Sequence, residues 1–134
     1  MVTRKTVWIG TNWKMNKGPS EALAAAEALK GYHPPEGVKP FIITPFTSLQ
    51  VVAETLKTSD VLVGAQNMNW EESGSWIGEI SPGMAKECGA EIVLDGHSAR
   101  RQHFAETAWT VRRKLAAALR PGWKPVLWSG ERLH

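Results

Sequence analysis

Short apolar runs alternate along the chain with longer stretches of helix-forming residues. The apolar runs are continuous and do not alternate with polar positions, which is typical of strands covered on both faces. They occupy residues 7–13, 40–44, 61–66, 92–94 and 126–128. Strands separated by helices pair in parallel through right-handed crossovers, so the pattern predicts an α/β fold of parallel β/α units. It fits a doubly wound sheet and part of a barrel equally well.

The stretches between these runs carry helix signals. We expect helices at residues 21–32, 47–56, 81–89 and 107–119. The first has Leu23, Ala26 and Leu29 along one side, the spacing of a helix. Thr47 or Ser48 is expected to cap the second. The third has Pro in its first turn and Gly just past its end.

Composition narrows the class of protein. The 134 residues are 43% hydrophobic and 22% charged, which is ordinary for one globular domain. No apolar run approaches the roughly 18 residues of a membrane span, and the start lacks the apolar middle of a signal peptide. We therefore expect a cytoplasmic protein with no membrane partner. Cys88 is the only cysteine and is expected to be a small, partly buried apolar residue, with no metal site.

The net charge of +3 indicates an anionic small substrate more than nucleic acid. The basic residues are spread along the chain, and their only local clusters are Arg100-Arg101 and Arg112-Arg113-Lys114. A nucleic-acid binder would concentrate them in a stripe or a known module. The first strand is not followed by a glycine-rich phosphate loop, which counts against nucleotide binding.

Polar side chains follow the predicted strands, at the edge of a parallel sheet where ligands bind. Asn12 and Lys14 follow the first strand, Gln66 the third, His97 the fourth and Glu131 the fifth. A lysine ammonium suits a phosphate or a developing enolate oxygen, and an imidazole can polarise a carbonyl or carry a proton. Taken singly, such a lysine or histidine is as well explained by a solvated surface charge or a structural role.

Four motifs together resemble one family. They are Gly-Thr-Asn-Trp-Lys-Met-Asn-Lys at 10–17, Val-Gly-Ala-Gln-Asn at 63–67 with the segments 71–74 and 78–81, Gly-His-Ser at 96–98 with Arg100-Arg101, and residues 125–127 with Ser-Gly-Glu at 129–131. In this order they resemble the triosephosphate isomerases over essentially the whole chain. The resemblance predicts a single partial domain at residues 1–134, the N-terminal half of a TIM (β/α)8 barrel, about its first five strands.

The resemblance also implies an activity. Members of that family interconvert glyceraldehyde 3-phosphate and dihydroxyacetone phosphate through an enediolate, in glycolysis and gluconeogenesis, without a metal or organic cofactor. By position, Asn12 and Lys14 would bind the substrate, and His97 with Lys14 would be catalytic, the histidine as a neutral electrophile. The family's catalytic glutamate lies about seventy residues after the histidine, beyond residue 134. We therefore expect a weak or inactive isomerase when the chain is alone, with Glu131 in a structural role.

Two other readings stay open. The Trp8-Ile9-Gly10 lead, residues 45–47, and residues 66–68 with Trp70 most resemble a branch that isomerises erythrulose phosphate. Alternatively, the chain is a non-catalytic half barrel, truncated or engineered for assembly. If the chain acts as an isomerase, the expected substrate class is a phosphorylated triose or tetrose. The expected partner is a second copy, bound through the loop from Asn67 to Glu79 or through the open barrel edges.

Several residues depart from the family pattern. Ala99 stands where the family has a glutamate that helps to hold the lysine, so Lys14 is expected to be less well oriented. Asp95 stands at an apolar strand position, where an unpaired carboxylate is expected to take up a proton. Trp128 is expected to overpack the fifth strand. Ile77 replaces a threonine that contacts the partner subunit.

Overall fold

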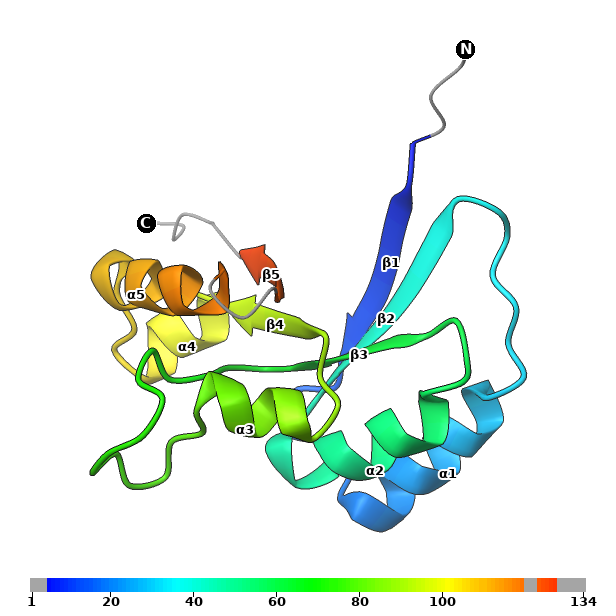
Figure 1. The fold of residues 1–134 in the computed structure, drawn as a ribbon, viewed down its shortest axis with the longest axis horizontal. Coiled ribbons are helices and arrows are strands. Elements are labelled where there is room, and N and C mark those ends of the chain that lie inside the picture. Colours follow the sequence, from blue (N-terminus) through cyan, green and yellow to red (C-terminus); the bar gives the residue numbers. More distant parts are fainter. Residues whose placement is uncertain (1–4, 120–122, 128–134) are drawn as a thin grey trace.

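A parallel five-stranded sheet forms the centre of the molecule (Figure 1). The computed structural model describes residues 5–119 and 123–127. The strands pair in chain order, and they are β1 (Val7–Asn12), β2 (Val38–Thr44), β3 (Leu62–Ala65), β4 (Ile92–Asp95) and β5 (Lys124–Leu127). The sheet curls so far that the Lys124 ammonium on β5 lies 5.5 Å from the ring centre of Trp8 on β1. The predicted half barrel is thereby confirmed.

Five helices join the strands in the part of the chain that the structure describes. They are α1 (Pro19–Leu29), α2 (Phe46–Leu56), α3 (Pro82–Glu87), α4 (Ser98–His103) and α5 (Ala108–Leu119). The short α3 begins as its sequence predicts, because the Ser81 hydroxyl accepts a hydrogen bond from the Met84 amide at 3.1 Å. Gly89 follows its end with a φ of +103°, a left-handed conformation that favours glycine. No helix among the described residues is long and apolar enough to cross a membrane.

The sequence prediction for the cap of α2 was wrong, and one helix was missed. Neither Thr47 nor Ser48 caps α2, which begins at Phe46; the buried Ser48 hydroxyl instead donates to the Lys17 carbonyl oxygen at 2.7 Å. On α1 the buried residues are Ala22 and Ala26, while Leu23 is 41% exposed. The small alanines allow α1 to lie close against the neighbouring α2. The helix α4 was not predicted at all.

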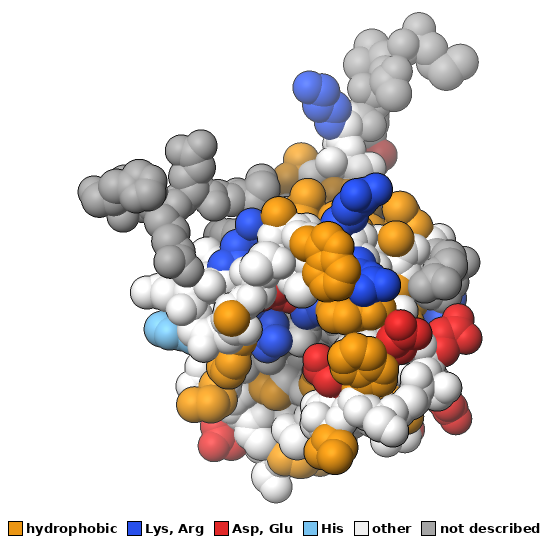
Figure 2. Space-filling view, turned by 90° about the vertical axis from the view of Figure 1, so that its left-hand side faces the viewer, with side chains coloured by type: hydrophobic (Ala, Val, Ile, Leu, Met, Phe, Trp, Pro, Cys, Tyr) orange, Lys and Arg blue, Asp and Glu red, His pale blue; other side chains and the backbone are white. Residues whose placement is uncertain are grey.

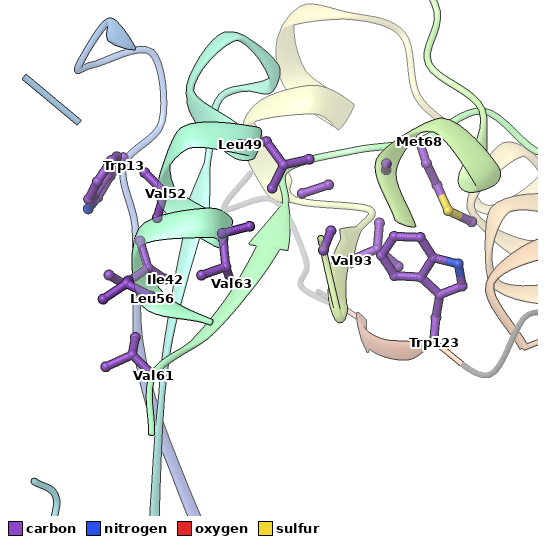
Figure 3. Close-up of a cluster of buried hydrophobic side chains, with 14 of the residues drawn as sticks. Trp13, Ile42, Leu49, Val52, Leu56, Val61, Val63, Met68, Val93 and Trp123 are labelled. Atoms are coloured by element: carbon purple, nitrogen blue, oxygen red, sulfur yellow. The ribbon is translucent and has the colours of Figure 1, made fainter. Parts of the chain in front are cut away.

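The two faces of the sheet bury different clusters. The outer face packs Ile42, Val63 and Val93 against Leu49 and Val52 of α2, and this is the larger cluster (Figure 3). The alternate strand positions point to the inner face, where Ile43, Ile92 and Leu94 form a smaller buried cluster with Phe41, Leu62 and Val126 partly buried around it. The near-continuous apolar runs of the sequence follow from this two-sided burial.

The first strand is the most exposed part of the sheet. Residues 7–11 of β1 are all exposed, and the side chains of Val7 and Ile9 are 49% and 58% exposed. Among the described residues β1 pairs only with β2. Its other edge is therefore open to a further strand. The predictions for Trp128 and Glu131 lie outside the described residues.

Replacing Gly64 by alanine is expected to destabilise the fold by about 1–3 kcal/mol, because the inner face of β3 has no room for a methyl group. A Cβ at this position would lie 2.6 Å from the Ile92 carbonyl oxygen and 2.7 Å from Cδ1 of Ile43. Urea denaturation measures the loss. Gly31 has nothing within 4 Å of such an atom, so Gly31→Ala is the matched control. Equal effects of the two substitutions would show that β3 and β4 are not so closely packed.

Candidate active site

A pocket of about 570 Å³ opens at the carboxyl ends of the strands. It brings together three residues singled out from the sequence, Asn12, Lys14 and His97. Gln66 and Asn67 line it from the end of β3. The remaining lining residues are Met15, Phe46, Gly78, Glu79, Leu94, Ala99, Arg100 and Phe104. Residues from three strand ends thus share one polar and apolar cavity.

Lys14 is held through its backbone. Its φ is +55°, a left-handed conformation that residues other than glycine rarely adopt. Its amide donates to the Asn12 side-chain oxygen at 2.9 Å. The side chain is exposed, and among the described residues no carboxylate forms an ion pair with its ammonium. Ala99 lines the pocket where the family's glutamate is expected.

Gln66, at the end of β3, binds the segment at the end of β1 on which Asn12 and Lys14 lie. Its Nε2 donates to the Lys14 carbonyl oxygen at 2.7 Å and to the Asn12 Oδ1 at 3.1 Å. The sequence placed Gln66 on the rim of the sheet but gave it no role. The available signal was a carboxamide directly after a buried strand, in a chain that places its ligand-binding groups at strand ends.

His97 lies at the first turn of α4 and is half-buried. Its Nδ1 accepts a hydrogen bond from the Ala99 amide at 3.0 Å, so the proton of the neutral ring is on Nε2. Burial lowers the pKa of His97, and the positive charge of Lys14 lowers it further. The imidazole is therefore neutral at pH 7 and can donate a hydrogen bond through Nε2.

Behind the pocket lies a buried charge cluster, which we define as Arg100, Glu106, Lys114 and Asn67. The Lys114 ammonium pairs with Glu106 Oε1 and donates to Asn67 Oδ1 at 2.7 Å. Glu106 Oε2 lies 3.5 Å from Arg100 Nε. The side chains of Lys114 and Glu106 are only 4% and 2% exposed. Because Asn67 and Arg100 also line the pocket, the cluster supports two of its walls.

Asp95, at the end of β4, is fully buried against this cluster. Within the part of the chain that the structure describes, neither of its carboxylate oxygens has a hydrogen-bond partner. Burial raises its pKa from 3.8 to about 7; Lys114 opposes this rise and Glu106 adds to it. The sequence-based expectation that this carboxylate tends to take up a proton is confirmed. Elsewhere, no three His, Cys, Asp or Glu side chains of the described residues are grouped to hold a metal ion.

The curled parallel sheet, with a polar pocket at the carboxyl ends of its strands, defines the N-terminal half of a (β/α) barrel. A family model described as triosephosphate isomerase matches residues 7–134. The chain belongs to the triosephosphate isomerase family.

Three relatives carry one name, L-erythrulose-1-phosphate isomerase. The protein of Mesorhizobium japonicum is 48% identical over 132 residues, 97% of this chain and 52% of the relative. The protein of Mycolicibacterium smegmatis is 52% identical over 129 residues, 93% of this chain and 49% of the relative. The protein of Rhizobium meliloti is 45% identical over 134 residues, which are 98% of this chain and 52% of the relative. The chain thus spans about half the length of the curated relatives it matches.

Proposed function

We propose that the chain supplies Asn12, Lys14 and His97 to a sugar-phosphate isomerase site. The observation that carries the proposal is their meeting in one pocket, with His97 neutral and its ring proton on Nε2. The relatives' name favours L-erythrulose 1-phosphate as the ketose substrate. Triose phosphates, the substrates of the family's namesake, are the second candidate.

In the proposed reaction a ketose phosphate and an aldose phosphate interconvert through an enediolate. Lys14 would attract the anionic substrate, and Asn12 would offer its carboxamide. The Nε2–H of His97 would donate to the carbonyl oxygen, which makes the neighbouring carbon more acidic and stabilises the enediolate. A carboxylate would remove the proton from one carbon and return it to the next. The family's glutamate follows residue 134, so we propose that turnover needs a polypeptide that supplies it.

We also propose that a second copy binds at the loop from Asn67 to Glu79. Ile77 in this loop is fully exposed, and Met15 beside the pocket is 95% exposed. Trp70 stacks edge-on against Trp76 at 5.6 Å and against Trp109 at 6.1 Å between ring centres. Figure 2 faces this side of the molecule, where large hydrophobic side chains lie at the surface among charged groups. Exposed apolar side chains gathered in this way favour a protein contact.

The alternative function is a non-catalytic half barrel that serves as an assembly module. The exposed β1 and its open edge favour it. The two functions differ in turnover: the module binds a partner through the strand edge and isomerises nothing.

The test is an isomerase assay on L-erythrulose 1-phosphate and glyceraldehyde 3-phosphate. The purified chain is assayed alone and mixed with the second half of the Mycolicibacterium smegmatis relative. We expect turnover in the mixture, and His97→Gln is expected to lower kcat by about 10²–10³-fold, the usual effect of losing one donor to a developing oxyanion.

The matched control for this assay is His103→Gln, because His103 is an exposed histidine at the other end of α4. It is expected to leave kcat unchanged. A folded mixture without turnover, or equal losses in the two variants, would contradict the isomerase proposal and leave the assembly module.

A further inference from the structure

We infer that Gln66 is a positioning residue of the proposed site, whose carboxamide fixes the backbone of Lys14 and thereby sets where the Lys14 ammonium lies relative to His97. The inference rests on the proposed function and assigns a role to a residue to which the sequence analysis gave none. Gln66 itself has no role in the chemistry; it acts through Lys14.

The first support is the way in which Gln66 spans the sheet. It directly follows β3, while Asn12 and Lys14 lie at the end of β1, with β2 between the two strands. Its two hydrogen bonds, at 2.7 Å to the Lys14 carbonyl oxygen and 3.1 Å to Asn12 Oδ1, connect segments more than fifty residues apart. A side chain that reaches over a whole strand to bind two groups of the pocket is placed to fix their relative position.

The second support is the conformation of Lys14. The φ of +55° is unfavourable for a lysine and persists only where its surroundings hold it. Two bonds do so: the Lys14 amide donates to Asn12 Oδ1, and its carbonyl oxygen accepts from Gln66. The same Asn12 oxygen accepts from Gln66, so the three residues form a closed ring of hydrogen bonds. Without Gln66 the carbonyl would lose a restraint, and the strained backbone would be free to relax.

The third support is that the side-chain ammonium of Lys14 has no ion-pair partner among the described residues. Ala99, which lines the pocket, has no charge to offer it. The backbone ring is therefore the restraint on Lys14 that the described structure provides.

The position of Lys14 can be measured on a neighbouring group. The Lys14 charge contributes to the lowered pKa of His97, after the larger effect of burial. If the ammonium moves away, the pKa of His97 rises, although Gln66 carries no charge of its own. The readout requires neither substrate nor turnover, so its result is independent of the isomerase assay.

The experiment is an NMR titration of the His97 ring in the full chain, with the signal assigned by its loss in His97→Gln. Lys14→Met is expected to raise the pKa of His97, and Gln66→Met to raise it by a part of that amount. The double variant Lys14→Met/Gln66→Met is expected to match Lys14→Met, because Gln66 acts through the lysine. Gln50→Met, a change at an exposed glutamine of α2, is the control and is expected to leave the pKa unchanged.

Three outcomes would overturn the inference. One is an unchanged pKa of His97 in Gln66→Met; another is an unchanged pKa in Lys14→Met, which would mean that no ammonium is held near the ring. The third is a further rise in the double variant, which would show a general loosening of the pocket. If Gln66→Met does not fold, Gln66→Ser replaces it with the same expectations, since it also removes the long donor.

Discussion

Replacing Asp95 by leucine is expected to stabilise the folded chain, and to do so more strongly as the pH rises. Asp95 is fully buried with no hydrogen-bond partner among the described residues, and its pKa is raised from 3.8 to about 7. Between these values the folded state keeps a proton that the unfolded chain releases, so stability falls as pH increases through this window. A shift of this size corresponds to about 4 kcal/mol. The advantage of Asp95→Leu over the wild type should therefore grow by about 4 kcal/mol from pH 4 to pH 8.

Urea denaturation of both proteins across this pH range measures the difference between their free energies of unfolding. Because all other groups titrate in both proteins, their contributions cancel in this difference. The variant Asp95→Asn distinguishes the effect of the carboxylate charge from the effect of a buried polar group. It has nearly the same shape as the aspartate and cannot ionise, so it should remove the same pH dependence. It should gain less than leucine in absolute stability, because its buried amide still lacks partners. An advantage of Asp95→Leu that stays constant with pH would show that Asp95 ionises in the folded state as it does in the unfolded one.

Replacing Lys114 by methionine is expected to destabilise the chain by about 3–5 kcal/mol, since one partner of a buried ion pair is left without the other. Glu106 would keep only Arg100, at 3.5 Å, and the Asn67 oxygen would lose its donor. The pKa of Asp95 should rise further, because Lys114 is the charge that lowers it. Urea denaturation at pH 7 measures the loss in unfolding free energy.

The neighbouring Arg112 provides a matched control, since it is an exposed cation on the same helix. Arg112→Met is expected to change stability by no more than about 0.5 kcal/mol. The double variant Lys114→Met/Glu106→Met should regain most of the loss, because it removes the uncompensated charge and leaves apolar side chains in its place. If Lys114→Met costs no more than Arg112→Met, the pair does not carry the stability that its burial indicates.

Much of the fold could be predicted from the sequence because strands buried on both faces leave a strong pattern. Continuous apolar runs located all five strands to within a few residues, and the motifs selected the barrel over the doubly wound sheet. The six-residue α4 was not predicted because it has no apolar periodicity. Its N-terminal cap is the ring of His97, which is not one of the usual capping residues. The prediction that Ser48 caps α2 was wrong because its hydroxyl donates to the distant Lys17 carbonyl oxygen and does not accept from an amide at the helix end.

The candidate site was predicted less completely than the fold. Asn12, Lys14 and His97 were found because parallel strands bring their ends together, and the structure places them in one pocket. Lys114 was missed because it was counted with Arg112 and Arg113 as one local cluster of basic residues. Helical spacing puts it on the buried face with Val111 and Ala118 instead. Gln66 was missed because its reach across β2 depends on the curl of the sheet, which no local pattern encodes.

The order of the strands bears on how such a barrel is made. Across the described sheet each strand pairs with the one before it in the chain, as where Val38 lies opposite Val7 and Lys124 opposite Ile92. A chain emerging from the ribosome can therefore add each new unit to a template that already exists, and no earlier pairing has to open. The same rule makes the fold extensible: a lineage can lengthen or shorten the sheet at its growing edge by one β/α unit, and the older pairs keep their register.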